Sequence, residues 1–372
     1  MLDWEKIRLD FPVCERMVYL NSAAAGAVSR PAMEAAASFY REMMEEGDAR
    51  WEEWLEQREA VRRRIAAFIN AEPDEVAFTT NTSTGMNLII DALEGRGEVI
   101  SSDLEFPAST ITWLHRGVPV HLVETVEGEL RLADVRQAMS DKTAIICLSH
   151  VQYSNGFRTD LEELGRSKSE HTLVVNASQS AGAFEIDVKR MRIDALCSTG
   201  HKWMLSAYGS GFVYLSRKLL DETRARGIGW LSVLDPYEMR NREFHVRHDA
   251  AARTEIGCPH FAGIFALGAT ADYMMKLGTK EIEQRVLALN RHLTGRLVEE
   301  GWHVLSPLRD GKSRSGETLV AMPRPKRVVA QLRERNIAVT EKPQGIRIST
   351  HFFNNEADIE RLIAALDEIR NS

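Results

Sequence analysis

Short apolar runs alternate with helix-length segments through the middle of the chain, and this alternation constrains the fold more than any other feature. The runs are often β-branched and bounded by polar residues or glycine, which is typical of buried strands. Strands alternating with helices favour an α/β fold with a mostly parallel sheet. We therefore expect a seven-stranded sheet from residues 76–79, 98–101, 118–123, 144–149, 173–176, 195–198 and 211–215. Helices are expected at 83–93, 108–116, 130–139 and 161–169.

The pattern changes after about residue 260. Two long helical segments, 261–277 and 279–300, precede short apolar runs near 302–305, 317–321 and 346–349, and a last helix is expected at 356–370. Near the other end, 31–70 indicates two helices rich in Glu, Arg and Ala. We expect a large α/β domain at 21–260, and a small α+β domain formed by 1–20 together with 261–372.

Composition excludes several classes of protein. The net charge of −7 over 372 residues argues against nonspecific nucleic-acid binding. No stretch approaches 18 consecutive apolar residues, and the N-terminus lacks the layout of a signal peptide, so neither a membrane span nor export is expected. The four cysteines form no CxxC and no metal-ligand spacing. We expect a cytoplasmic protein with reduced thiols and no metal.

Polar residues gather where the expected strands end, and ligands of an open parallel sheet bind at the carboxyl ends of its strands. Lys202 directly follows a strand; partial desolvation would leave its amine neutral and able to attack an aldehyde, although a lysine there is more often solvated. Thr82-Ser83 lies between a strand and a helix, where hydroxyls and backbone N–H groups can hold a phosphate or simply cap the helix.

Together these segments resemble the class V aminotransferase family of fold-type I pyridoxal 5′-phosphate (PLP) enzymes, which includes cysteine desulfurases, kynureninases and isopenicillin N epimerase. The likeness runs from Tyr19-Leu20-Asn21 to Ile346-Arg347-Ile348-Ser349. Its strongest stretch, 176–203, contains Gln179, Asp194 and His201-Lys202-Trp203. The resemblance implies PLP as cofactor, a small-molecule amino-acid substrate and a homodimer.

The resemblance also implies roles for single residues. Lys202 matches the lysine that forms the Schiff base and moves the Cα proton, and Arg347 matches the arginine that binds the substrate α-carboxylate. The matching cofactor contacts are Thr82, Ser83, Thr199 and His201 for the phosphate, Gln179 for the pyridine 3-oxygen, and Asn155 for the same edge of the ring. Further candidate substrate contacts are Asn21, Ala23, Trp230 and His260.

Three departures from the family pattern bear on the reaction. Asn176 replaces the usual aspartate that pairs with the protonated ring nitrogen; an amide carries no charge and should weaken carbanion stabilisation by about 1 kcal/mol or more. Phe106 replaces a stacking histidine and cannot move protons. Segment 336–345 lacks the nucleophilic cysteine of desulfurases, and Cys258 matches a residue near the phosphate of the partner subunit. Whether Asn176 is an adaptation or an inactivating replacement stays open.

The predicted function is therefore chemistry at Cα of an amino acid through Lys202. β-Elimination of the C–S lyase kind, or epimerisation, is slightly favoured, because both ask less of a weak electron sink than transamination does. An aminotransferase and a non-catalytic PLP-binding protein are the alternatives, and a cysteine desulfurase is disfavoured.

Overall fold

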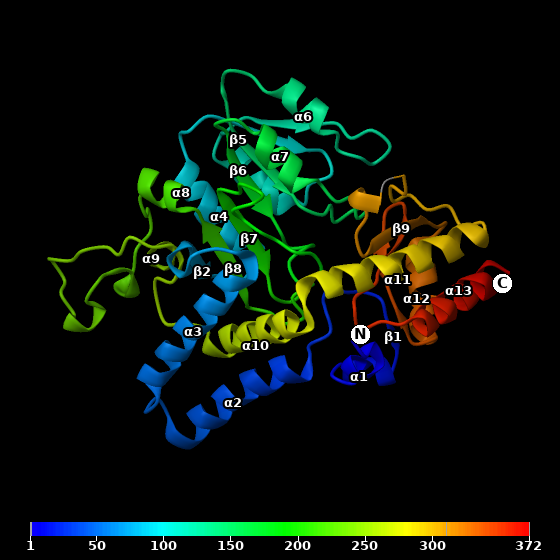
Figure 1. Cartoon of the computed structure of the whole chain (residues 1–372), viewed down its shortest axis with the longest axis horizontal. Coiled ribbons are helices and arrows are strands. Elements are labelled where there is room, and N and C mark those ends of the chain that lie inside the picture. Colours follow the sequence, from blue (N-terminus) through cyan, green and yellow to red (C-terminus); the bar gives the residue numbers. More distant parts are fainter. Residues whose placement is uncertain (1, 310, 372) are drawn as a thin grey trace.

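A seven-stranded sheet lies at the centre of the larger part of the molecule (Figure 1). The computed structural model describes residues 2–309 and 311–371. The strand order is β2-β8-β7-β6-β5-β3-β4; β8 is antiparallel to both neighbours and the other pairs are parallel, which confirms the expected sheet. The strands are β2 (Val76–Phe78), β3 (Glu98–Ser102), β4 (Val120–Val123), β5 (Thr143–Ser149), β6 (Thr172–Asn176), β7 (Ala195–Thr199) and β8 (Gly211–Leu215).

Helices cover both faces of this sheet, which explains why its central strands are apolar on both sides. Along β6, Val174 packs into one hydrophobic cluster, whereas Leu173 and Val175 pack into another on the opposite face. The covering helices include α4 (Thr82–Leu93), α5 (Ile111–His115), α6 (Leu132–Ala138), α7 (Leu161–Ser167), α8 (Arg217–Glu222) and α9 (Ala251–Thr254). The helix expected at 108–116 is shorter than predicted, because a 3₁₀ turn at Pro107–Ser109 precedes it.

Long helices pack beside the large sheet and lead toward the smaller part of the molecule. They are α2 (Arg30–Glu46), α3 (Trp51–Ile69), α10 (Phe261–Leu277) and α11 (Thr279–Glu299). α10 packs against α2 and α3, and α11 carries the chain to a second, smaller sheet. The expected domain boundary between residues 260 and 261 stays a prediction.

The smaller sheet is antiparallel, with strand order β11-β12-β9. Its strands are β9 (Glu317–Ala321), β11 (Thr340–Lys342) and β12 (Gly345–Ser349), and its helices are α12 (Pro325–Glu334) and α13 (Glu356–Arg370). The N-terminal segment, with α1 (Trp4–Arg8), joins this part because β1 (Val18–Tyr19) pairs with β10 (Ile337–Ala338). The strand expected near 302–305 is reduced to one bridge between Val304 and Val320. Across residues 2–309 and 311–371, the helices are all too short or too polar to cross a membrane.

Candidate active site

The turn that carries Lys202 follows β7 and is fixed by the backbone around it. The N–H of Gly26 donates to the carbonyl oxygen of His201 at 2.7 Å. A Cβ atom on Gly26 would lie 2.0 Å from the carbonyl oxygen of Lys202, so the close approach requires glycine. On the other side, the buried Trp203 donates its indole N–H to Gln179 Oε1 at 2.7 Å. Lys202 is therefore presented from a rigid support.

The amine of Lys202 lies in a setting that favours its neutral form. Burial and then the charge of Arg347 lower its pKa to about 8, while the carboxylate of Glu317 opposes them. Its Nζ is 5.6 Å from the centroid of the Phe106 ring. A neutral amine is the form that attacks an aldehyde, so this lysine fits covalent attachment of a carbonyl cofactor.

The surroundings of His201 make it a poor candidate for proton transfer. Its ring stacks on Tyr208 with centroids 4.3 Å apart, and Nδ1 lies 2.7 Å from the hydroxyl of Thr199. Burial and the neighbouring Lys202 lower the pKa of His201 to about 4, so the imidazole is neutral at physiological pH. The two side chains thus form a neutral hydrogen-bonding pair beside Lys202.

Hydroxyl groups gather at the start of α4, next to the ends of β6 and β7. Thr82 Oγ1 lies 2.5 Å from Ser178 Oγ, and both side chains are buried. Ser83 is exposed, and Asn81 caps the helix by accepting from the N–H of Thr84 at 2.9 Å. The first N–H groups of a helix lack acceptors within it, and its dipole attracts anions. This arrangement fits a phosphate group.

The side chains of Asn176 and Gln179 are oriented by defined partners. Asn176 Oδ1 accepts from the N–H of Ser178 at 3.1 Å, and its Nδ2 donates to Ser109 Oγ at 3.0 Å. The Asn176 amide therefore keeps one N–H free of these two bonds. Gln179 bridges Trp203 and the carbonyl oxygen of Ala23, to which its Nε2 donates at 3.0 Å.

Arg347 lies on β12 and is buried, yet its guanidinium is incompletely paired. One of its amino groups donates to the carbonyl oxygen of Tyr153 at 2.8 Å and lies 3.4 Å from Glu317 Oε2. Its Nε has no hydrogen-bond partner among the described residues. A buried guanidinium with an unused donor fits a carboxylate ligand, which it can bind through two parallel hydrogen bonds.

Two charged residues of this sheet were missed by the sequence analysis. Both carboxylate oxygens of the fully buried Glu317 lack a hydrogen bond within the described chain, and burial raises its pKa to about 7 against the charge of Arg347. Lys342 Nζ lies 4.5 Å above the ring of Tyr153. The signal that could have found Glu317 is the alternation of side chains along a strand. Leu319 pairs with Arg347 and so lies on the same face of the sheet, and Glu317, two residues before Leu319, lies on that face as well.

The remaining predicted contacts occupy more varied places. The side chain of Asn21 accepts a hydrogen bond from the hydroxyl of Thr340 on β11. Thr340 pairs with Arg347 on β12, so Asn21 lies near the strand that carries Arg347. Ala23 is buried and contributes its carbonyl oxygen to Gln179. Asn155 is committed to the backbone: its Nδ2 donates to Gly128 O at 2.7 Å, and its Oδ1 accepts from Phe157 N–H at 3.0 Å.

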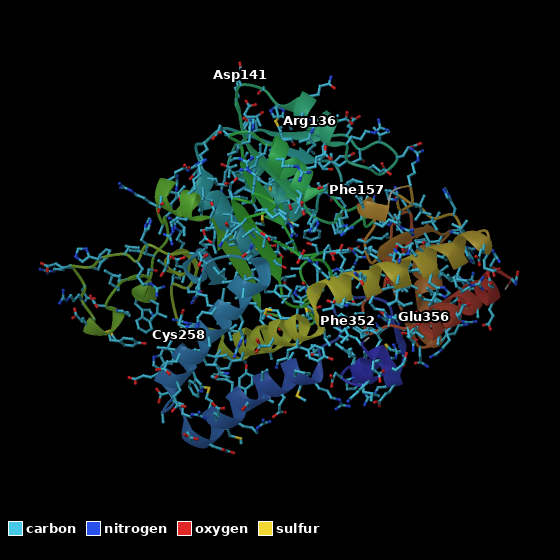
Figure 2. All side chains as sticks on the ribbon, in the orientation of Figure 1. Arg136, Asp141, Phe157, Cys258, Phe352 and Glu356 are labelled. Carbon is cyan, nitrogen blue, oxygen red and sulfur yellow. The ribbon has the colours of Figure 1, made fainter. Side chains whose placement is uncertain are left out.

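Three candidates precede α10 in the chain: Trp230, Cys258 and His260. Cys258 is exposed just before α10 (Figure 2). His260 Nδ1 lies 3.0 Å from the carbonyl oxygen of Gly209, in the loop that follows the Lys202 turn. Trp230 packs edge-on against Tyr237 at 5.8 Å.

Comparison with known proteins agrees with this geometry. The model of the family "Aminotransferase class-V" matches residues 18–362. The chain is 26% identical to an uncharacterized aminotransferase, YcbU, of Bacillus subtilis over 98% of its own length and 97% of the relative. It is 27% identical to the isopenicillin N epimerase of Amycolatopsis lactamdurans over 83% and 84% of the two chains. An apo cysteine desulfurase from Thermococcus onnurineus superposes with a TM-score of 0.90 at 25% identity, covering 99% and 98%.

The family match and the structural neighbours make this chain a PLP-dependent enzyme of fold type I, and the buried lysine at a strand end and the hydroxyl-lined helix start fit that class. The chain belongs to the class V aminotransferase family. Its cofactor is pyridoxal 5′-phosphate, and the side chains present fit that group: an amine for the aldehyde and hydroxyls for the phosphate. When bound, PLP supplies an electron sink for charge that develops at Cα.

Proposed function

We propose that this enzyme removes the Cα proton of an amino-acid substrate and expels a substituent from Cβ, as a C–S lyase does. The position of Lys202 beside Phe106 carries the proposal. An aromatic hydrocarbon ring cannot accept or donate a proton, and the neighbouring His201 is stacked and neutral. Lys202 is then the group that moves the proton. β-Elimination needs one such base, whereas epimerisation also needs a proton donor on the opposite side of Cα.

Arg347 is the proposed anchor for the α-carboxylate. Its Nε is buried and has no hydrogen-bond partner within the described chain, and leaving such a group unsatisfied costs roughly 1–3 kcal/mol or more. A substrate carboxylate would satisfy this donor. The anchor would hold Cα at a fixed distance from Lys202, which is what stereospecific proton removal requires.

Asn176 supports an elimination over a transamination. Its carbonyl oxygen is occupied by the N–H of Ser178, so the group left over is an N–H donor. A donor favours an unprotonated pyridine nitrogen and hence a weaker electron sink. Transamination needs a long-lived charge at Cα, whereas elimination discharges it into a leaving group.

The cysteines support a reaction other than desulfurase chemistry. Cys147 and Cys197 are buried in β5 and β7, where burial raises the pKa of both thiols, and Cys14 is half-buried with its pKa raised to about 11. A thiol held protonated is a poor nucleophile. Cys258 is exposed but lies outside the strands that carry Arg347 and Lys342. All four thiols are unpaired, which also fits the proposed cytoplasmic location.

The test is product analysis with purified holoenzyme and a panel of amino acids. Elimination predicts a 2-oxo acid, ammonia and the released thiol or other leaving group, with the cofactor kept as the aldehyde. Borohydride should fix the cofactor to Lys202, and Lys202→Ala should remove both the adduct and turnover. Stoichiometric conversion to pyridoxamine phosphate would instead establish an aminotransferase, the alternative that the relative YcbU favours. Inversion of Cα without elimination would establish an epimerase.

Asn176→Asp separates the two interpretations of the amide. A carboxylate favours the protonated ring and should raise the pyridoxamine fraction by roughly tenfold for each 1.4 kcal/mol gained. If Asn176 is an adaptation, the enzyme as given is active and the replacement mainly increases this side reaction. Restoration of turnover by orders of magnitude would mark Asn176 as an inactivating replacement.

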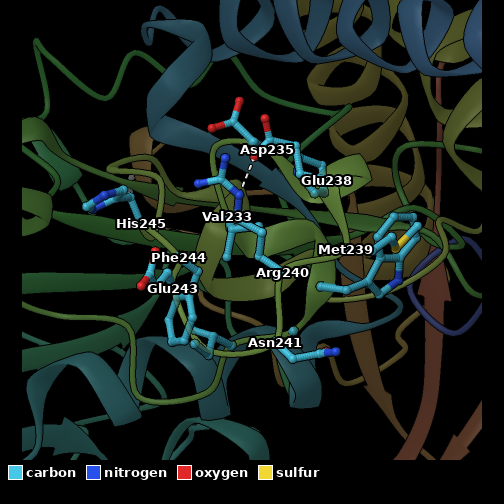
Figure 3. A pocket seen from close by; sticks show the side chains of 13 residues that line it. Val233, Asp235, Glu238, Met239, Arg240, Asn241, Glu243, Phe244 and His245 are labelled. Atoms are coloured by element: carbon cyan, nitrogen blue, oxygen red, sulfur yellow. Dashed lines mark ion pairs between the residues drawn. The ribbon is translucent and has the colours of Figure 1, made fainter.

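A homodimer is the proposed assembly. Residues 224–256 project from the large sheet and expose large apolar side chains, among them Leu234, Tyr237, Met239 and Phe244 (Figure 1). Met239 and Phe244 line a pocket in which Arg240 pairs with Glu238 at 2.6 Å (Figure 3). Exposed apolar patches of this kind mark protein–protein contacts. Sedimentation at micromolar concentration should give twice the chain mass; a fully active monomer would contradict the proposal.

A further inference from the structure

Lys342 and Arg347 share one face of the smaller sheet. In the antiparallel pair β11–β12, Thr340 lies opposite Arg347 and Lys342 lies opposite Gly345. Side chains two residues apart point to the same side, so Lys342 and Arg347 are diagonal neighbours, with β-carbons roughly 7 Å apart in such a pair. Gly345 has no side chain to cover the lysine stem from across the strand. The two cations are thus spaced side by side.

Tyr153 ties both cations to the region around Lys202. Its carbonyl oxygen accepts from Arg347 at 2.8 Å, and its ring lies 4.5 Å beneath Lys342 Nζ. The same ring packs edge-on against Phe106 at 5.1 Å, and Phe106 in turn lies beneath Lys202. The two aromatic rings therefore form a wall along which three cationic side chains are arranged.

The charges on this wall are out of balance. The carboxylate of Glu317 pairs with Arg347 at 3.4 Å. Within the described residues, no carboxylate oxygen lies within 4.0 Å of Lys342 Nζ. Burial and the charge of Arg347 lower the pKa of Lys342 to about 8, a shift that an added anion would reverse. An uncharged substrate side chain would leave this half-buried cation without a partner.

We propose that Lys342 binds a second anionic group of the substrate, so that the enzyme acts on amino acids whose side chain or leaving group carries a carboxylate. This inference rests on the proposed function, in which Arg347 holds the α-carboxylate. Lys342 then selects the side chain: an ammonium over an aromatic face offers an anion a charge-assisted hydrogen bond in a partly desolvated place. The lysine contacts the substrate without taking part in the chemistry at Cα.

The test uses pairs of amino acids that match in shape and differ in charge. Dissociation constants of the holoenzyme for L-aspartate and L-asparagine, and for L-glutamate and L-glutamine, are measured from changes in the cofactor absorbance. We expect at least one acid to bind roughly tenfold or more tightly than its amide, as one charge-assisted contact allows. Lys342→Met should abolish that preference and leave amide binding unchanged, and Lys342→Arg should keep it.

Lys326→Met is the matched control, because Lys326 is an exposed lysine that lines the same surface depression as Lys342. It should retain the preference. Equal binding of acid and amide by the unaltered enzyme, or an equal loss of both in Lys342→Met, would overturn the role of Lys342. If no amino acid of any kind changes the cofactor absorbance, the proposed function itself fails. If Arg347→Met weakens the binding of the acid and of the amide equally, the proposed role of Arg347 as the α-carboxylate anchor is supported independently of the result at Lys342.

Discussion

Two of the arginine–glutamate pairs buried in the described part of the chain differ in how completely they are hydrogen-bonded. Arg62 on α3 donates to both oxygens of Glu255, at 2.5 and 2.8 Å, and the N–H of Phe78 adds a third bond at 2.9 Å. Arg347 and Glu317 lie 3.4 Å apart, and neither Glu317 oxygen has a hydrogen bond within the described chain. The first pair is complete, whereas the second leaves donors and acceptors unused.

The pKa shifts of the two glutamates follow this difference. Burial would raise the pKa of Glu255, but the charge and hydrogen bonds of Arg62 outweigh burial and hold it below its usual value. For Glu317, burial dominates the three nearby cations, and its pKa rises to about 7. Two pairs with the same chemistry thus differ in their surroundings: one ties α3 to β2 and the end of α9, and the other leaves part of a guanidinium unpaired.

The largest expected effect is on stability. Glu255→Gln leaves Arg62 buried with only part of its countercharge, and the free energy of unfolding should fall by about 3 kcal/mol or more. Glu317→Gln removes a buried carboxylate whose two oxygens lack hydrogen bonds within the described chain. The free energy of unfolding should therefore fall by less than about 1 kcal/mol, or rise. Urea denaturation of both variants measures the difference. Equal losses would show that the two pairs are equivalent.

Binding should respond in the opposite way. Arg347→Met should raise the dissociation constant for amino-acid substrates roughly 100-fold, because about 2–3 kcal/mol of charge-assisted hydrogen bonding is lost. The same variant should still bind the cofactor, since the proposed role of the guanidinium is to anchor the substrate; loss of its charge should raise the pKa of Lys202. The folded fraction of Arg62→Met should bind the same substrates with a dissociation constant within about twofold of that of the unaltered enzyme. Weaker binding in Arg62→Met would contradict the assignment of roles.

The pH dependence of stability should have opposite signs for the two glutamates. Glu317 has a raised pKa, so the folded state binds its proton where the unfolded state has lost it; its contribution is fully present below about pH 4.5 and is lost as the pH rises through about 7. Glu255 has a lowered pKa, so its contribution is present above the unfolded value and is lost as the pH falls. Each slope is at most about 1.4 kcal/mol per pH unit. Stability curves of the Glu317→Gln and Glu255→Gln variants, each subtracted from the unaltered protein, should slope in opposite directions.

The smallest expected effect concerns capture of the cofactor. Lys202 reacts as a neutral amine, so the rate at which apoenzyme is reconstituted with PLP should rise with pH through about 8. Glu317 raises the pKa of Lys202, and Glu317→Gln should therefore shift this midpoint to lower pH, by less than about one unit. Glu255→Gln should leave it in place. A midpoint near the ordinary lysine value would contradict the burial of the amine.

Much of the fold was predictable from the sequence, because periodicity is a local property. The apolar runs that became β5, β6 and β7 are short and bounded by polar residues, and their two buried faces leave a plain signal. The run at 302–305 carries the same apolar signal, yet only Val304 pairs, with Val320. Strand pairing needs a partner at the right place, and that place depends on the whole of the smaller sheet.

The site divides in the same way. Lys202, Thr82 and Arg347 could be proposed from the sequence because each lies at a recognisable position on the chain, at a strand end, a helix start or within a family motif. Asn155 was assigned to the cofactor, and the structure commits its amide to Gly128 and Phe157. Chain position alone does not say which way an amide points or what already satisfies it.

The sequence by itself determined the order of strands and helices and the family, and it supplied the proposed role of Lys202, since these follow from patterns that lie close together in the chain. Only the tertiary structure decided which cations are paired. Glu317 and Lys342 meet Arg347 through strand register, and Tyr153 reaches both cations from a distant loop. Charge balance depends on distances across the fold, and the substrate that this site selects depends on that balance.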